Sequence, residues 1–282
     1  MSAMNFRQLS PTDSGVLRLP TKTVEKVWGC DLLPPPFAAV SQAAGGQRIG
    51  EIWFDPPPEF GQLLAKYLFT SEKLSVQVHP AAAHAPAGMT GKDECWLVTS
   101  VQPGAKLAIG LTHEVSRNHL EEAARDGTIV ELLSWYHAAP GDFFYLPAGT
   151  IHAIGPGIGL IEVQQNSDIT YRLYDYGRPR ELHLEQALEV AIRAPYPAHC
   201  YRKAAESGPV TLLEGPHFRV DRLDGPADAE TLGNYNQPLM VLPVDGPVMI
   251  GPEQFDAGEC AIAPALSHVS LSPGVRVLIA RP

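Results

Sequence analysis

Four side chains with nitrogen or oxygen donors stand at the edges of predicted strands, and together they could bind a metal ion. They are Gln77, His79, Glu94 and His152. Two imidazoles and one carboxylate, with an amide oxygen as a weaker fourth ligand, suit a borderline divalent ion such as Zn²⁺. A site with so few strong protein ligands leaves coordination positions for water or substrate, which is typical of catalytic rather than structural metal sites.

The stretch from Gly141 to His152 predicts how one of these histidines is positioned. Residues 143–146 are apolar and suit a strand buried on both faces. Pro147 lacks a backbone N–H, and Gly149 permits a backbone conformation that other residues resist. The strand should therefore stop, turn tightly and present His152 at the start of the next strand. Taken alone, the stretch is equally consistent with a surface hairpin that carries an incidental histidine.

Residues 74–80 alternate between apolar and polar side chains, which is typical of a strand with two different faces. The polar face would carry Ser75, Gln77 and His79, and the strand ends at the proline that follows. A polar row normally faces solvent, so a half-exposed strand is the alternative interpretation. Glu94 opens another apolar strand, expected over residues 95–99. The candidate ligands would thus sit on rigid strands, where a pre-formed site can be built.

The rest of the pattern predicts a mainly β protein with a few helices. Ser116 can cap a helix that continues to about Arg125 and stops at Gly127. A second helix is expected over residues 181–194, while residues 60–69 fit a short helix or an irregular strand. Further strands are expected over residues 21–29, 49–54, 129–137, 142–146, 159–165 and 169–176.

Near residues 195–205 the sequence changes to a pattern of short strands and turns, which predicts two domains. Residues 1–197 would form the metal-binding domain, and residues 198–282 a smaller β domain. In the second part, Gly258 and Pro264 repeat the spacing of Gly141 and Pro147, although His268 comes one residue earlier after its proline than His152 does, and no partner ligands accompany it. We therefore expect a degenerate second copy of the barrel without a metal site.

Composition and charge exclude several classes of function. The chain has 21 basic and 31 acidic side chains and a net charge of −10, without a basic stripe, so nucleic acid is not an expected partner. The four cysteines are far apart, which argues against a disulfide framework and a thiolate zinc site. No run approaches the ~20 apolar residues that span a membrane. These features predict a soluble protein of the cytoplasm.

The chain resembles the short bacterial mannose-6-phosphate isomerases, which belong to the cupin superfamily. Residues 141–152 are similar to the second cupin motif, which alone is unspecific because cupins carry many chemistries. More specific matches run in order from about residue 24 to 195, with a looser fit beyond. They are Trp28-Gly29, residues 50–53 (GEIW), residues 74–80 (LSVQVHP), residues 91–96 (GKDECW) and residues 164–172 (QQNSDITYR).

The resemblance implies a cupin-type double-stranded β-helix followed by a degenerate β-barrel domain. It also implies interconversion of mannose 6-phosphate and fructose 6-phosphate through an enediol, with a divalent metal ion, Zn²⁺ above others, as cofactor. A small sugar phosphate would be the partner, neither nucleic acid nor membrane would be bound, and the chain could form a homodimer. One departure is Ala81-Ala82-Ala83, where relatives commonly carry acidic residues.

The family's functional residues fall on defined positions of this sequence. Its metal ligands correspond to Gln77, His79, Glu94 and His152. Its active-site arginine corresponds to Arg172, and a pocket carboxylate, a candidate for the proton-shuttling base, corresponds to Glu162. Positions near the substrate and its phosphate correspond to Lys66, Ser75 and Lys92.

Two other functions remain open from the sequence. A cupin oxygenase that uses Fe²⁺ could employ the same two histidines and carboxylate, although it gives no role to Lys92 and Arg172. A non-catalytic sugar-phosphate-binding protein could keep the pocket without turnover. The changed residues 81–83 are the feature that favours this second alternative.

Overall fold

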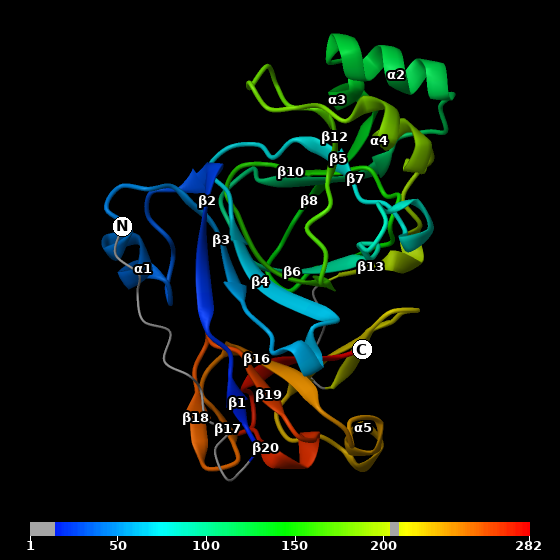
Figure 1. Cartoon of the computed structure of the whole chain (residues 1–282). Helices are drawn as coiled ribbons and strands as arrows, with labels where there is room; N and C mark the ends of the chain where they lie inside the picture. The colour runs from blue at the N-terminus through cyan, green and yellow to red at the C-terminus, as the bar shows by residue number, and fades with distance from the viewer. Residues whose placement is uncertain (1–14, 204–208) are drawn as a thin grey trace. The chain divides into compact units, whose positions relative to one another are not determined.

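The computed structural model describes residues 15–203 and 209–282, which form two compact units (Figure 1). One unit comprises residues 21–203, and the other combines residues 15–20 with residues 209–281. The division into residues 1–197 and 198–282 that the sequence predicted remains a proposal. The strand pairing adds that β1 (Leu17–Arg18) pairs antiparallel with β19 (Ala261–Ala263), near the other end of the chain.

The unit of residues 21–203 consists of two antiparallel sheets whose strands surround a common interior (Figure 1). In spatial order, the 7-stranded sheet contains β13 (Tyr201–Arg202), β9 (Phe143–Leu146), β6 (Glu94–Val101), β11 (Ile158–Gln165), β4 (Leu63–Phe69), β3 (Ile49–Phe54) and β2 (Thr21–Cys30). The 5-stranded sheet contains β12 (Tyr171–Tyr174), β5 (Val76–Val78), β10 (His152–Ile154), β7 (Lys106–Leu111) and β8 (Leu133–His137).

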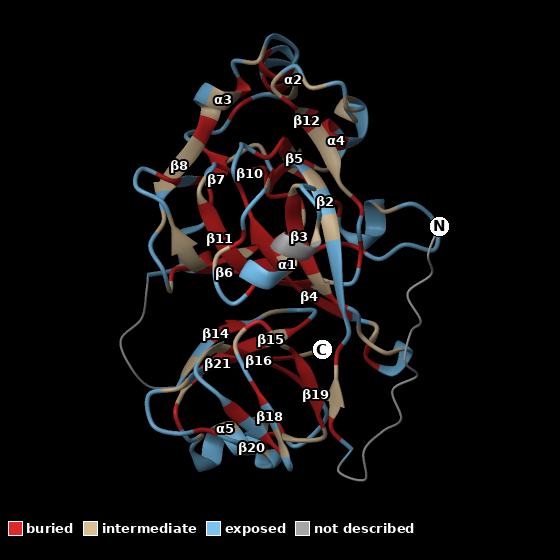
Figure 2. Ribbon diagram, turned by 90° about the vertical axis from the view of Figure 1, so that its left-hand side faces the viewer, coloured by how far each residue is buried: buried red, intermediate tan, exposed pale blue. Residues whose placement is uncertain are grey.

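Apolar side chains from both sheets fill one part of this interior. Trp96 and Leu160 from the 7-stranded sheet pack in one buried cluster with Leu107 and Ile154 from the 5-stranded sheet. Because side chains alternate along a strand, Val76 on β5 and its neighbours on the same face point outward instead, where helices cover them. Figure 2 shows how the buried residues concentrate on the strands, with exposed residues on helices and loops.

Three helices pack on the outer face of the 5-stranded sheet: α2 (Arg117–Asp126), α3 (Ile129–Leu132) and α4 (Leu184–Val190) (Figure 1). Helix α2 confirms the prediction for its stretch. The Ser116 side chain accepts a hydrogen bond from the His119 N–H at 3.1 Å, and Gly127 ends the helix with φ of 88°. Helix α1 (Ala38–Ala43) and the 3₁₀ turns η1 (Pro58–Phe60), η2 (Ala82–His84) and η3 (Ala198–Cys200) complete this unit.

Two sequence predictions were wrong in extent. The strand expected over residues 129–137 begins as helix α3, because Gly127 turns the chain and buries Ile129 in the cluster beneath α2. The helix expected over residues 181–194 is limited to α4. It ends early because neighbouring segments use its last backbone groups: the Ile192 N–H donates to the Gly149 carbonyl (2.8 Å), and the Arg193 carbonyl accepts from Val115 (3.0 Å).

Most of the other strand predictions are confirmed within a few residues. Strands β2, β3, β9 and β11 lie where they were expected, and β12 is shorter than the predicted 169–176. Residues 60–69, for which the sequence fitted helix and strand equally, form mainly β4.

The second unit is also mainly β. Its 6-stranded sheet contains β1, β19, β16 (Leu239–Asp245), β21 (Arg276–Arg281), β15 (Arg219–Asp224) and β14 (Val210–Glu214), and its 3-stranded sheet contains β18 (Glu253–Phe255), β17 (Val248–Ile250) and β20 (Val269–Ser270). Helix α5 (Ala229–Asn234) and the 3₁₀ turn η4 (Leu266–His268) complete it. Among the described residues, the one group of three histidine, cysteine or carboxylate side chains close enough to hold a metal ion lies in the other unit.

Candidate active site

Three of the four predicted ligands converge in the interior of the first unit. His79 follows β5, Glu94 opens β6 and His152 opens β10, and their donor atoms all lie within 4.8 Å of one another. Glu94 Oε2 is 3.4 Å from His79 Nε2, and Glu94 Oε1 is 3.5 Å from His152 Nε2. All three residues are buried. The sequence therefore identified residues that the fold brings together from three separate strands.

The turn before His152 links two of the ligand strands. The Gly149 N–H donates to the His79 carbonyl at 2.7 Å. Gly149 has φ of +91°, and a Cβ there would lie 2.9 Å from the Val190 carbonyl oxygen. Both the left-handed conformation and the close approach favour glycine, as the sequence predicted. The turn is further fixed by Asp93, whose carboxylate accepts from the Ala148 N–H (3.0 Å) and the Tyr145 hydroxyl.

The two imidazoles are oriented and neutral, as metal ligands must be. His79 Nδ1 donates to the Ile169 carbonyl (2.7 Å), and His152 Nδ1 donates to the Thr150 carbonyl (2.9 Å). Because a carbonyl can only accept, each Nε2 keeps its lone pair and faces Glu94. Burial and the nearby Lys92 ammonium lower the pKa of His79 well below its usual value, and burial lowers the pKa of His152.

Glu94 is the charged member of the group. Burial alone would raise the pKa of its carboxyl, but the Lys92 ammonium and the other neighbouring groups outweigh burial, so the pKa lies below its usual value. Within the described part of the chain, no hydrogen-bond donor reaches Glu94 Oε1. A buried carboxylate oxygen without a donor is costly unless a cation satisfies it.

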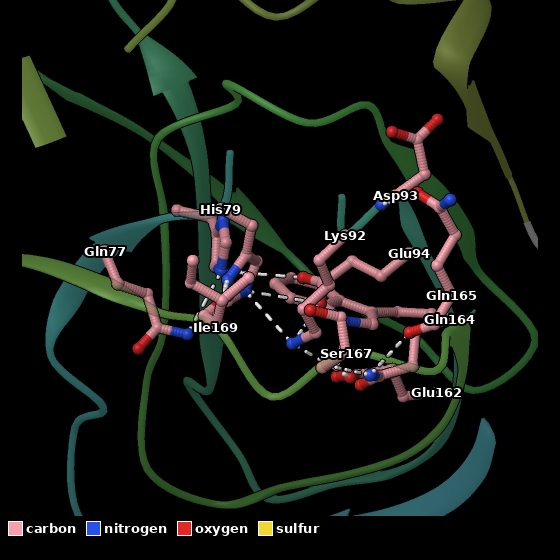
Figure 3. Close-up of polar contacts among 12 residues, drawn as sticks. Gln77, His79, Lys92, Asp93, Glu94, Glu162, Gln164, Gln165, Ser167 and Ile169 are labelled. Atoms are coloured by element: carbon pink, nitrogen blue, oxygen red, sulfur yellow. Dashed lines mark hydrogen bonds and ion pairs between the residues drawn. The ribbon is translucent and has the colours of Figure 1, made fainter. Parts of the chain in front are cut away.

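The place occupied by the Lys92 ammonium, beside Glu94 and His79, favours positive charge. Lys92 Nζ lies 2.8 Å from Glu94 Oε2 and 3.1 Å from His79 Nε2, and Figure 3 shows these side chains pointing toward one another. Two nitrogen donors, one carboxylate and an unpartnered carboxylate oxygen fit a divalent ion of the zinc type. We conclude that His79, Glu94 and His152 could hold such an ion.

The predicted fourth ligand, Gln77, lies beside this group. Its Nε2 is 3.2 Å from His152 Nε2, and its Oε1 accepts a hydrogen bond from the Ser75 hydroxyl at 3.0 Å. Gln77 is also the partner of His152 on β10 and of Arg172 on β12. Ser75 itself is buried, and it contacts the amide rather than the cavity.

A row of alternating charges crosses the opposite sheet. Glu162 on β11 pairs in register with Lys66 on β4 and with Trp96 on β6. Glu162 Oε1 lies 2.9 Å from Lys66 Nζ and 3.6 Å from Lys92 Nζ. Beyond Lys66, the row continues to Glu51 at 4.0 Å. The whole row faces the same interior as the histidines, because alternate residues of neighbouring strands share one face.

The charged row lines one cavity of about 250 Å³ together with Gln77 and Glu94, and His79 and His152 adjoin it through their contacts with Glu94. Its wall contains five cationic side chains and four carboxylates. They are Lys26, Lys66, Lys92, Arg172 and Arg180, and Glu51, Glu94, Glu162 and Asp168. The apolar part of the wall includes Trp28, Leu68, Leu74 and Ile154. Residues of this kind suit a small, polar and anionic ligand with some apolar surface.

Arg172 differs from the cavity lysines and from Arg180 in its partners. The Arg172 guanidinium forms no ion pair with any described residue, although burial and Arg180 lower its pKa. The Arg180 guanidinium is held by the buried Asp175 through two contacts of 2.6 and 2.7 Å. Sequence reasoning missed Arg180 and Glu51 as cavity residues. A signal for Arg180 existed in its position eight residues after Arg172, beyond a turn containing Gly177.

A two-sheet barrel with a His–Glu–His group in its interior defines a cupin-type fold. Comparison with solved structures supports this assignment. The mannose 6-phosphate isomerase of Bacillus subtilis matches with a TM-score of 0.73 at 23% identity, over 95% of this chain and 99% of that one. The apo form of the Salmonella typhimurium enzyme matches with a TM-score of 0.68 at 14% identity, over 95% and 99% of the two chains. The predicted fold class is confirmed.

Sequence comparison places the chain in a family. It is 34% identical over 260 residues to the mannose-6-phosphate isomerase of Streptococcus mutans, covering 84% of this chain and 81% of that one. It is 38% identical over 197 residues to ManA of Bacillus subtilis, covering 63% and 62%. No family model matches. The chain belongs to the mannose-6-phosphate isomerase family, so the predicted membership in a family of isomerases is confirmed.

No helix in the described part of the chain is long and apolar enough to cross a membrane.

Proposed function

We propose that this protein is a metal-dependent aldose-ketose isomerase that interconverts mannose 6-phosphate and fructose 6-phosphate through an enediol. The observation that carries the proposal is one cavity lined by Glu94, Glu162 and Arg172, in which Glu94 is also a member of the group formed with His79 and His152. The relatives' names supply mannose 6-phosphate as the substrate, and fructose 6-phosphate is the ketose that isomerisation of this aldose between C1 and C2 would give. An expected cytoplasmic location and a homodimer stay predictions.

The metal ion would be held by His79, Glu94 and His152, and Zn²⁺ is the ion that best suits these donors. The Gln77 amide oxygen would be a further ligand only after the amide turns over, because its nitrogen now faces His152 and its oxygen accepts from Ser75. When bound, such an ion supplies Lewis acidity that makes the proton next to a carbonyl easier to remove. Ser75 acts through Gln77, because its hydroxyl donates to that amide.

Glu162 is the carboxylate that we assign to the proton transfer between C1 and C2. Its side chain is 3% exposed, and two ammonium groups lie beside it. Lys66 and Lys92 hold this carboxylate in place, and they offer donors to the oxygens of a sugar in the cavity. A positioned carboxylate within reach of the substrate is the usual requirement for general acid–base catalysis.

The phosphate of the substrate would lie nearer the arginines. Lys66 and Lys92 are buried and already face carboxylates, so they have less charge to offer a dianion. Arg172 has no competing ion pair among the described residues, and a planar guanidinium binds phosphate through two parallel hydrogen bonds. We therefore assign the anion site first to Arg172, which is also the β-strand partner of Gln77. Arg180 lines the same cavity and, because Asp175 contacts only its Nε and Nη2, would add a hydrogen-bond donor there rather than an uncompensated charge.

Substitution of Arg172 tests the proposal. We expect Arg172→Ala to lower turnover of mannose 6-phosphate by ~100-fold or more, as removal of a positioned cationic donor does in other active sites. Because Arg172 is not among the metal-binding residues, the purified variant should retain as much zinc as the wild type. Arg172→Lys should recover only part of the activity. Wild-type turnover in the Arg172→Ala variant would contradict the assignment, and oxygen consumption without isomerisation by the wild type would favour the oxygenase.

A further inference from the structure

We propose that Trp96 is a positioning residue for the reaction. Its indole N–H fixes the orientation of the Glu162 carboxylate, while its ring packs against the metal-binding His152. This inference rests on the proposed isomerase activity, in which Glu162 moves the proton. Neither the ligand set nor the charged row includes Trp96 as a chemically active group, so its role would be exerted through its two neighbours.

The bond between Trp96 and Glu162 is built into the sheet. The two residues are direct partners on β6 and β11, and Trp96 Nε1 lies 3.0 Å from Glu162 Oε2. Trp96 is 1% exposed and Glu162 is 2% exposed. An indole nitrogen can only donate, so this contact has one possible direction at every pH.

The two oxygens of Glu162 thereby acquire different partners. Trp96 occupies Oε2, whereas Oε1 lies 2.9 Å from Lys66 Nζ and 3.6 Å from Lys92 Nζ. Without the indole donor, the carboxylate could rotate and turn both oxygens toward the ammonium groups. A reacting carboxylate that is misplaced by ~1 Å can lose ~100-fold in rate.

The charge of the donor matters as much as its position. A third cation at Oε2 would hold the carboxylate more strongly, but it would also stabilise the anion and make it a weaker base. A neutral indole orients the Glu162 carboxylate and adds no further positive charge to the row. An indole donor also occurs at the other end of the row, where Trp53 Nε1 lies 2.7 Å from Glu51 Oε2, but there Lys26 Nζ lies 3.3 Å from the same oxygen.

The ring of Trp96 has a second contact that joins the two halves of the site. Its centroid lies 5.4 Å from that of His152, with an interplanar angle of 82°. This edge-to-face packing holds the imidazole from the side, in addition to the hydrogen bond at Nδ1. Trp96 thus contacts both a residue of the proposed metal centre and the residue assigned to the proton transfer.

The test removes the N–H and keeps the ring. Trp96→Phe should lower kcat of the zinc-loaded enzyme by about 10- to 100-fold, with KM within about threefold of the wild type and zinc content unchanged. The matched control is Trp135→Phe, which removes an indole hydrogen bond of 3.2 Å to the Val130 carbonyl, away from the cavity. This control should keep wild-type kcat.

A double-mutant cycle separates positioning from general damage. If Trp96 acts through Glu162, then Trp96→Phe in a Glu162→Ala background should change kcat less than about twofold. Losses that multiply in the double variant would overturn the proposal, as would a folded, zinc-loaded Trp96→Phe enzyme with wild-type kcat.

A spectroscopic readout applies even if Trp96→Phe does not fold. In ¹⁵N-tryptophan-labelled protein, Glu162→Ala should shift the Trp96 indole N–H signal and leave the Trp135 signal in place. An unshifted Trp96 signal would overturn the proposed bond. If this signal shifts but the wild type fails to isomerise mannose 6-phosphate, the proposed function fails, and the catalytic role of Trp96 fails with it while the bond stands.

Discussion

The buried ammonium of Lys66 gives the most direct energetic prediction. Its side chain is 5% exposed, and it lies 2.9 Å from Glu162 and 4.0 Å from Glu51. Lys66→Met keeps most of the length of the side chain but leaves these two buried carboxylates without their shared cation. Removal of one partner from a buried ion pair costs ~3–5 kcal/mol. Because Lys92 and Trp96 still contact Glu162, we expect a loss near the lower end of this range, about 3 kcal/mol.

Lys26→Met is the matched control. Lys26 also pairs with Glu51, at 3.3 Å, but its side chain is 28% exposed. Lys26 is partly solvated, and Glu51, although buried, keeps Lys66 as a partner, so this variant should lose only about 1 kcal/mol. The comparison holds the residue types constant and changes mainly the burial.

The effect of Lys66→Met should depend on pH. Burial would raise the pKa of the Glu51 carboxyl, but Lys66, Lys26 and the Trp53 indole outweigh burial, and the pKa lies below its usual value. A carboxyl with a depressed folded-state pKa stabilises the fold above its unfolded pKa, ~4.3. This stabilisation is lost as the pH falls through the folded pKa. The penalty of Lys66→Met should therefore be full at pH 7 and shrink below about pH 4.

Urea unfolding followed by tryptophan fluorescence measures this difference. All four tryptophans lie in the unit of residues 21–203, namely Trp28, Trp53, Trp96 and Trp135. The signal therefore reports on the unit that contains Lys66, whatever the other unit does. A loss below about 1 kcal/mol at pH 7, equal to that of Lys26→Met, would refute the reasoning that the buried row is an electrostatically coupled unit.

Two further predictions concern the anion site and helix α2. Arg180→Ala should raise KM for mannose 6-phosphate by about 10-fold or more and weaken inhibition by inorganic phosphate. The reason is that a charge-assisted hydrogen bond contributes ~1.5–3 kcal/mol. Unchanged phosphate inhibition would exclude Arg180 from the anion site. Ser116→Ala should destabilise the unit by ~1 kcal/mol because the His119 N–H loses its acceptor at 3.1 Å; an unchanged urea midpoint would show that the cap is dispensable.

Local patterns in the sequence were sufficient to predict those elements whose structure is determined by interactions within a few residues along the chain. Ser116 and Gly127 predicted both ends of α2, because a side-chain cap and a left-handed glycine act within one turn. The two-residue alternation around Gln77 predicted which side chains share a face of β5. Pro147 and Gly149 predicted a turn whose backbone is in fact tied to the His79 carbonyl.

Tertiary contacts decided the elements that the sequence did not predict. Residues 191–194 have a helical pattern, but Gly149 and Val115 use their backbone groups for hydrogen bonds between segments. No local pattern near residue 192 identifies these hydrogen-bond partners. The same holds for α3, whose Ile129 is drawn into a cluster with α2.

The residues of the candidate site likewise fall into those that the sequence could predict and those that depend on tertiary contacts. Histidine and carboxylate ligands carry a chemical signature, so they could be found from residue type and from the resemblance. Trp96 and Glu51 lie within the matched stretches 91–96 and 50–53, but their residue types alone do not indicate which group each one contacts. Their importance comes from register: Trp96 faces Glu162 only because β6 and β11 pair as they do. Lys66 was predicted beside the substrate phosphate, and its position between two carboxylates could not be seen without the sheet.

The most direct test of the central claim is removal of the metal. Wild-type protein would be stripped with a chelator, its metal content measured, and turnover of mannose 6-phosphate followed before and after addition of Zn²⁺ in stoichiometric amounts. Because His79, Glu94 and His152 form a buried, deprotonated ligand group, we predict that turnover disappears with the metal and returns with zinc. Full turnover by metal-free protein, or zinc bound without any turnover, would contradict the account.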